Sequence, residues 1–401
     1  MTLGQEITIG PFHFTVLRLL IAVGLVRAAI RGEQLAGGMN RMDWLMLAWS
    51  VWALASSIFH KDPLSALVFR LGLAFNACGI YFLIRVFCQS MDDLKDLFRI
   101  TAILLLPLAV TMLYEKLTYQ NLYAFAGAPE NPEIRNGYIR AQGPFTHSIL
   151  AGTAGAVCLP WMVGLWQEHR NLASVGIVAC VSMIFASGSS GPIMSAAAGI
   201  GALFMWLYRD KMRFVRWIAV LAYVALDIVM KAPAYYLIAK IDLVGGSTGW
   251  HRAFLLESAF IHLKEWWLAG TDYTIHWMPT GVPWSMDHTD ITNHYLHFGV
   301  VGGLPLIFLF IAILATGFSF VGQTLGRPDC LPAGSRFTLW ALGSALFVHV
   351  VTCISVSYFD QSFVFLYLTL AGIGSAYPGA LLEELDEDQP FADSPTSGLA
   401  V

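Results

Sequence analysis

The chain has 401 residues, of which 57% are hydrophobic and only 12% are charged. Soluble domains usually carry about 25% charged residues, so the composition argues against a soluble enzyme and indicates a membrane protein. The net charge of −4 gives no reason to expect nucleic acid as a partner. The six scattered cysteines form no CxxC pair and no Cys/His metal spacing. We therefore expect no disulfide framework, metal or cofactor.

Roughly eleven apolar stretches, separated by charged connectors, follow one another from Pro11 to Tyr377. A transmembrane helix needs about 20 mainly apolar residues to span about 30 Å of hydrocarbon. The stretches are 11–30, 43–59, 64–88, 97–114, 146–166, 172–187, 191–208, 214–230, 296–320, 336–356 and 360–377. They predict an all-α integral membrane domain over residues 1–378 with about 11 transmembrane helices. The first stretch lacks the marks of a cleaved signal peptide, so we expect it to be retained.

Lysine and arginine are divided unevenly between alternate connectors. Thirteen lie in one set: Arg27, Arg31, Arg41, Arg85, Lys95, Arg99, Arg170, Arg209, Lys211, Arg213, Arg216, Arg327 and Arg336. Eight lie in the other: Lys61, Lys116, Arg135, Arg140, Lys231, Lys240, Arg252 and Lys264. The smaller set falls mostly in two long loops, which weigh less in the positive-inside rule. We therefore expect the richer set in the cytoplasm and the N-terminus outside.

This orientation places both long loops, about 115–145 and 231–293, on the outer face of the membrane. Connections longer than about 15 residues are uncommon without a function, so the outer face is the predicted functional face. The polar segment from Glu383 to Asp393 then lies in the cytoplasm. Its composition predicts a disordered acidic tail over residues 379–401.

Arginines in the two outer loops are candidate anion ligands. Arg135 and Arg140 precede the stretch that begins near residue 146, and Arg252 lies in the first turn of a helical pattern over 250–266. A guanidinium group suits bidentate contact with phosphate oxygens. Alternatively, each arginine meets lipid headgroups at the membrane surface. Arg70 lies in the outer half of its stretch and is a further candidate cation.

Polar residues also gather where the stretch after the second loop begins. Asp290, Thr292 or Asn293 can cap this helix, which puts Asn293, His294 and Tyr295 in a first turn facing the outer surface. A neutral imidazole there can accept a proton from a hydroxyl group. Alternatively, the histidines are interfacial residues bonded to neighbouring helices. The turn containing Ser189 and Ser190 can cap a helix or help to cradle a phosphate oxygen.

In order, these segments resemble the membrane O-antigen ligase and polymerase superfamily. The similar segments are RAQGPFTHS, SGSSGP, HRAFLLESAF…LAGTDY and TNHYLHFGVVGGL, and the sharper part of the likeness lies within 135–310. The resemblance implies a C-type glycosyltransferase fold with a long outer loop, 231–293, that carries short helices. It also implies the bacterial cytoplasmic membrane as the location, with the active site facing outward.

The resemblance further implies a reaction. The family transfers a glycan from undecaprenyl pyrophosphate to a hydroxyl of a glycan, lipid or protein acceptor. Its arginines map onto Arg140 and Arg252, with Arg135 and Arg70 as further candidates. The usual His-Asn order is reversed here as Asn293-His294, which leaves His294 or His288 as the base.

A single displacement inverts the anomeric configuration, whereas retaining enzymes usually employ a carboxylate nucleophile. Glu257, Asp272, Asp287 and Asp290 are alternative carboxylate bases. The main rival function is a transporter or flippase, for which paired broken helices and mid-membrane ionisable residues are typical. The sequence does not separate a polymerase from a ligase.

Overall fold

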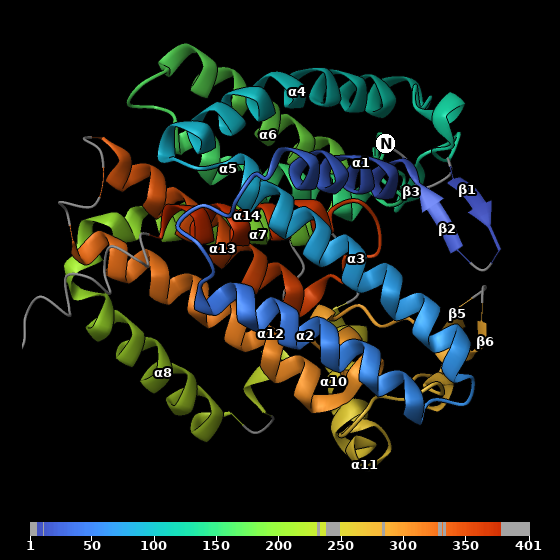
Figure 1. Ribbon diagram of the computed structural model, residues 1–401. Coiled ribbons are helices and arrows are strands. Elements are labelled where there is room, and N and C mark those ends of the chain that lie inside the picture. Colours follow the sequence, from blue (N-terminus) through green and yellow to red (C-terminus); the bar gives the residue numbers. More distant parts are fainter. Residues whose placement is uncertain are drawn as a thin grey trace, which may run out of the picture.

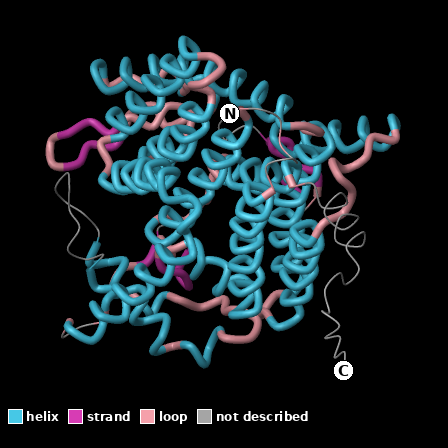
Figure 2. The backbone as a smooth tube through the Cα atoms, turned by 90° about the vertical axis from the view of Figure 1, so that its left-hand side faces the viewer, coloured by secondary structure: helices cyan, strands magenta, loops and turns pink. Residues whose placement is uncertain are grey.

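Helices that run alongside one another make up most of the computed structural model (Figure 1). The structure describes residues 6–10, 12–230, 233–237, 249–282, 285–327, 331 and 334–377. The predicted acidic tail lies outside the described residues. The fold is mainly all-α, as the sequence predicts, and Figure 2 shows how little of the chain is in strands.

Each predicted apolar stretch contains one long helix. These helices are α1 (Val16–Arg31), α2 (Arg41–Ala55), α3 (Pro63–Phe87), α4 (Met91–Thr118), α5 (Ser148–Gly164), α6 (Arg170–Ser187), α7 (Ser190–Phe204), α8 (Met212–Val229), α12 (His294–Gly326), α13 (Ser335–Ser355) and α14 (Phe363–Ala376). Within the described residues, six helical segments are long and apolar enough to cross a membrane. They are Arg41–Phe59, Pro63–Phe87, Met91–Thr118, Arg170–Ser187, His294–Gly326 and Ser335–Ser355. The chain therefore has membrane-protein character, and the count of about 11 crossings stays a prediction.

Short elements occupy the connectors. The helical ones are η1 (Ser56–Phe59), η2 (Ala124–Ala126), η3 (Met205–Lys211), η4 (Ala234–Tyr236), α10 (Gly249–Ile261), α11 (Leu263–Trp266) and η5 (Ile275–Trp277). The strands are β1 (Glu6–Ile9), β2 (Phe12–Thr15), β3 (Glu133–Arg135), β4 (Tyr138–Arg140), β5 (Gly281–Val282) and β6 (Ser285–Thr289). They form three separate antiparallel pairs, β1–β2, β3–β4 and β5–β6. The expected short helices of the second long loop are α10 and α11.

Helix α5 forms the centre of the bundle, and nearly all of its residues are buried. It packs against α6, α7 and α13, while α4 covers α6. Small residues allow this close approach: a Cβ atom added to Gly155 would lie 2.8 Å from the carbonyl oxygen of Cys180. Around this centre, α3 packs on α14 and α12 packs on α2 and α13.

Both long connectors gather at one end of the bundle. Figure 1 shows β3, β5, β6, α10 and α11 in the right-hand half of the view. The capping box of α4, in which Ser90 and Asp93 bond reciprocally, lies at the opposite end of that helix. The 28 residues of α4 separate the two ends by about 42 Å at 1.5 Å per residue.

Helix α12 is broken near the end that carries the connectors. Gly302 and Gly303 have non-helical backbone angles. Neighbouring segments form hydrogen bonds with the backbone around the break. Arg70 Nε donates to Val301 O, Trp52 Nε1 donates to Gly302 O, and Thr271 N donates to Val300 O. In the other direction, Leu304 N donates to Trp267 O. These contacts attach the segment after α11 to the first turns of α12.

Candidate anion-binding site

A small hairpin positions the first arginine. Strands β3 and β4 pair so that Glu133 lies opposite Arg140. The turn between them contains Asn136 and Gly137, whose φ angles of 52° and 79° suit a two-residue hairpin turn. Arg140 Nη1 donates to Glu133 Oε2 at 2.7 Å, and the Arg140 side chain is only 5% exposed.

The serine-rich turn supports Arg140 from the other side. Arg140 Nη2 donates to Ser189 Oγ, and Ser189 Oγ donates to the carbonyl oxygen of Ser187 at 3.2 Å. Gly188 has a φ angle of 55°, and a Cβ atom there would lie 3.3 Å from Arg140 Cγ. The turn that we considered as a cap or phosphate cradle therefore holds the guanidinium group in place. Ser190 is the first residue of α7.

The end of α4 fixes the chain around Arg140. The backbone amides of Gln142 and Gly143 donate to the Glu115 carboxylate at 3.1 and 2.7 Å. Lys116 Nζ donates to the carbonyl oxygen of Ile139 at 2.9 Å. Glu115 and Lys116 therefore hold the backbone on both sides of Arg140 through hydrogen bonds.

Arg252, in the first half of α10, lies within electrostatic range of Arg135, Arg140 and Asp290. Burial lowers the pKa of Arg252, and repulsion from Arg135 and Arg140 lowers it further, while Asp290 opposes the shift. The pKa of Arg140 is also lowered, chiefly by burial, with Glu133 opposing and Arg135 adding to the shift. We call Glu133, Arg135, Arg140, Arg252 and Asp290 the arginine cluster.

Two histidines border the arginine cluster. His147 caps α5 by accepting the Ile149 amide through Nδ1, and its Nε2 atom is 3.5 Å from Glu133 Oε2. Burial lowers the pKa of His147, partly offset by Glu133. His251 also has a pKa lowered by burial, with Asp290 as its acidic neighbour. Burial favours the neutral form of both histidines.

The arginine cluster has the properties of an anion site. The cluster contains three guanidinium groups and two carboxylates, which gives a formal charge of +1 with both histidines neutral. The Nε atoms of Arg140 and Arg252 are buried without a hydrogen-bond partner. Buried donors are normally satisfied, and arginines that repel one another gain from a bound anion. Phosphate oxygens match both the charge and the donor geometry.

The structure does not bring His294 to the arginines. We expected His294 in a first turn facing the outer surface, and it is the first residue of α12, but only 3% of it is exposed. Its Nδ1 atom accepts the Tyr358 amide at 3.3 Å, and its ring packs against Phe298 and Phe310. The large aromatic side chains around this turn bury a ring that the sequence pattern placed at the surface.

The other predicted residues near this turn have structural contacts. Asn293 is the N-cap of α12, as considered from the sequence, and its amide nitrogen donates to the carbonyl oxygen of Ile354 at 2.9 Å. Tyr295 Oη donates to the carbonyl oxygen of Val350 at 3.1 Å. His288 lies on β6, with Nδ1 2.7 Å from Ser285 Oγ.

Arg70 belongs to a different group of side chains. It donates to the carbonyl oxygen of Val301 at the break in α12 and contacts His60. His60 Nδ1 in turn contacts Asp272 Oδ1. Asp272 is its acidic neighbour. The contacts of Arg70 are therefore those of a residue that holds the break together.

Sequence reasoning missed Glu133 and His147. The signal for Glu133 was the Asn136-Gly137 pair between EIR and YIR, which is a strong hairpin pattern and sets Glu133 opposite Arg140. No local pattern marks His147 as a neighbour of Asp290, because His147 is the N-cap of α5 whereas Asp290 lies in the second long loop.

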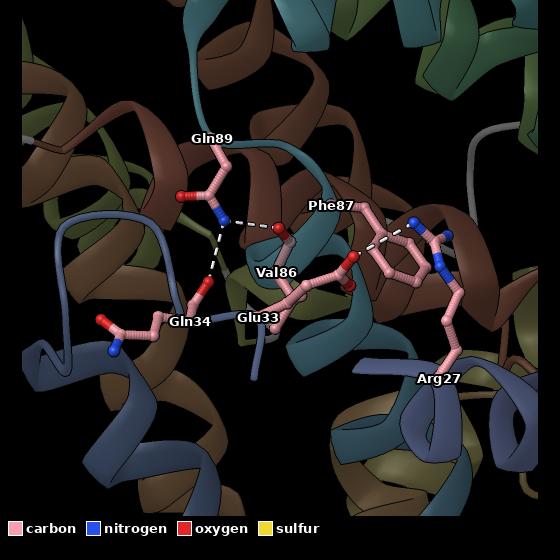
Figure 3. Close-up of a pocket in the computed structure, with 6 residues that line it drawn as sticks. All are labelled: Arg27, Glu33, Gln34, Val86, Phe87 and Gln89. Carbon is pink, nitrogen blue, oxygen red and sulfur yellow. Dashed lines mark hydrogen bonds and ion pairs between the residues drawn. The ribbon is translucent and has the colours of Figure 1, made fainter. Parts of the chain in front are cut away.

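A hollow at the opposite end of the bundle carries no comparable excess of charge. Figure 3 shows it lined by Arg27, Glu33, Gln34, Val86, Phe87 and Gln89. Arg27 Nη2 pairs with Glu33 Oε1 at 3.1 Å, and Gln89 Nε2 donates to the carbonyl oxygen of Gln34 at 2.8 Å. The Arg27–Glu33 ion pair leaves this hollow without a net charge from these two residues.

Comparison with protein-family models and with curated proteins finds no match to this chain.

Proposed function

We propose that the chain is an inverting membrane glycosyltransferase, a polymerase or ligase of surface polysaccharide. In this proposal it transfers a glycan from undecaprenyl pyrophosphate to an acceptor hydroxyl at the outer face of the bacterial inner membrane. The observation that carries the proposal is the convergence of Arg135, Arg140 and Arg252 from two separate long connectors. The placement of both connectors at one end of the bundle supports a single catalytic face.

The charge of the site suits the leaving group. When the anomeric carbon–oxygen bond breaks, negative charge builds on the pyrophosphate. Fixed cations in a partly buried site stabilise that charge most as it develops, which lowers the barrier. The unpartnered Nε–H groups of Arg140 and Arg252 are the donors that we assign to the phosphate oxygens.

Within the proposal, Asp290 is the best-placed base. It is exposed and lies within electrostatic range of Arg252, His147 and His251. A carboxylate beside the glycan donor can take the proton from the hydroxyl group of the acceptor molecule. The oxygen of that hydroxyl then attacks the anomeric carbon from the face opposite the pyrophosphate. The resemblance favours His294 or His288 instead, and Asp290→Asn and His294→Gln variants separate the candidates.

The test is transfer by purified protein in lipid nanodiscs supplied with a lipid-pyrophosphate glycan donor. We expect Arg252→Ala to lower the rate by ~10²–10³-fold, which is the typical effect of losing one donor to a developing charge. Arg252→Lys should recover only part, because lysine lacks the bidentate fork. Arg31→Ala, an exposed arginine at the end of α1, is the matched control. Wild-type rates in Arg252→Ala would contradict the proposal.

Cell-envelope polysaccharide from cells with and without the protein separates the two subclasses. Loss of long chains with single units retained indicates a polymerase. Accumulation of long carrier-bound chains indicates a ligase.

A transporter or flippase is the second candidate, because α12 is a broken helix. Hydrogen bonds from Arg70, Trp52 and Thr271 already occupy carbonyl groups at the break, which weighs against an ion or substrate there. Movement of a lipid-linked glycan across proteoliposomes without glycan transfer would favour this candidate.

A further inference from the structure

Three potential metal ligands meet in the second long connector, apart from the arginine cluster. They are His262 between α10 and α11, Glu265 in α11, and His276 in η5. The charged neighbours that influence Glu265 are His262 and His276.

The ligand atoms converge on one point. His262 Nδ1 is 2.8 Å from Glu265 Oε1, and His276 Nε2 is 2.9 Å from Glu265 Oε2. One ligand atom from each of the three residues lies within 4.8 Å of the others. Between 28% and 42% of each side chain is exposed, so an ion can reach the group from solvent.

Aromatic neighbours hold both imidazole rings. The two rings pack edge to face, with centroids 4.5 Å apart. Trp277 stacks on His262, and Tyr273 stacks on His276. Trp277 itself is buried in a small apolar cluster with Trp266, whose Nε1 atom donates to the carbonyl oxygen of Ala259 at 2.9 Å. A metal site works best when its ligands are fixed by such packing.

We propose that His262, Glu265 and His276 bind a divalent transition-metal ion, with Zn²⁺ as the best fit. Two imidazoles and one carboxylate are a known zinc ligand set that leaves a fourth position for water. Zn–N distances of about 2.0–2.1 Å place tetrahedral ligand atoms roughly 3.3 Å apart, so the ion requires only small rearrangement. The Nδ1 proton of His262 moves to its Nε2, and the Nε2 proton of His276 moves to its Nδ1.

The bound ion would cross-link α11 and η5. The segment between these elements is the one that bonds to the break in α12, through Thr271 and Trp267. The ion therefore fixes a surface segment against the start of α12, which is a structural role separate from glycan transfer. We expected no metal because the sequence contains no CxxC or Cys/His metal spacing. Glu265 and His276 are also 11 positions apart, so no local pattern links them.

The test uses the full chain in nanodiscs after chelation and re-addition of Zn²⁺ or Co²⁺. We expect one equivalent of Zn²⁺ per chain by equilibrium dialysis and a tetrahedral Co²⁺ absorption spectrum. Losing a residue that only supports a ligand typically lowers metal affinity by ~10–100-fold. Glu265→Gln removes a direct ligand, so we expect it to lower the Zn²⁺ affinity by at least that factor. His262→Ala/His276→Ala should bind no specific ion.

His169→Ala is the matched control, because His169 is an exposed histidine at the start of α6. It should keep wild-type metal binding. Thermal unfolding adds a second measurement: Zn²⁺ should raise the midpoint of the wild type and of His169→Ala, but not that of the double variant. Glu265→Gln keeps a polar side chain of the same size, which guards against loss of folding. Equal binding by the wild type and the double variant, or none by either, would overturn the proposal.

Discussion

Arg85 belongs to a buried charge system and the arginine cluster is a partly buried one, and the two differ in how fully their groups are satisfied. Arg85 is 0% exposed and forms an ion pair with Asp43, which is also 0% exposed. Its remaining donors reach the carbonyl oxygens of Ala36, Gly38 and Gly374. Each of its three nitrogens has a partner.

The arginine cluster is incomplete by comparison. Arg140 and Arg252 each keep a buried Nε atom without a partner, and positive charges repel one another across the group. Burial alone therefore does not separate the two groups. The anion-site proposal rests on unpartnered donors combined with like charges that lie close together.

The largest expected effect concerns stability. Arg85→Met should destabilise the protein by roughly 3–5 kcal/mol, because it leaves the buried Asp43 carboxylate without its ion-pair partner. Arg252→Met should leave stability unchanged or raise it, since it removes repulsion with Arg135 and Arg140. Thermal unfolding of both variants in the same nanodiscs checks the contrast. Equal losses in the two variants would show that the arginine cluster is as structural as Arg85.

A smaller effect is expected at the turn that supports Arg140. Gly188→Ala should cost ~1–2 kcal/mol, because an L-residue is disfavoured at the φ angle of 55°. The new methyl group would also press on Arg140 Cγ, 3.3 Å away. We therefore expect weaker binding of inorganic pyrophosphate, measured by calorimetry. Gly322→Ala, where no atom lies within 4 Å of the added Cβ, is the control.

The smallest effect concerns pH. Because burial holds the pKa of folded His147 below its ordinary value of 6.5, its contribution to stability is fully present above that value. The contribution is lost as the pH falls through the folded pKa, when the ring must charge beside the arginines. His147→Asn keeps a residue that can cap α5. In this variant the thermal unfolding midpoint should depend less on pH below 6.5 than it does in the wild type. If the unfolding midpoint of His147→Asn depended on pH as that of the wild type does, the charge state of His147 would not be linked to the arginine cluster.

Much of the fold was predictable because hydropathy acts locally. Each apolar stretch contains a helix, and the pattern over 250–266 became α10 and α11 with a break at His262. The strand pairs were not predicted, since they are only two to five residues long. Which helix occupies the centre was also not predictable, because α7 is as apolar as α5. The close packing at the glycines of α5 depends on which helices lie beside it.

The site was predictable only in part. Arg140 and Arg252 were selected as a pair, and they do share one electrostatic environment. Arg70 looked equivalent in the sequence but bonds to the break in α12 instead. His294 begins α12 as expected, yet aromatic side chains from α12 and from the segment before α14 enclose it.

The sequence by itself determined that this is a helical membrane protein with two long connectors, because the hydrophobic requirement of a bilayer applies to each segment separately. Only the tertiary structure decided which ionisable groups meet. Electrostatic repulsion and hydrogen bonding act across space, and residues such as Glu133, Arg252 and Asp290 become neighbours only after the helices between them have packed.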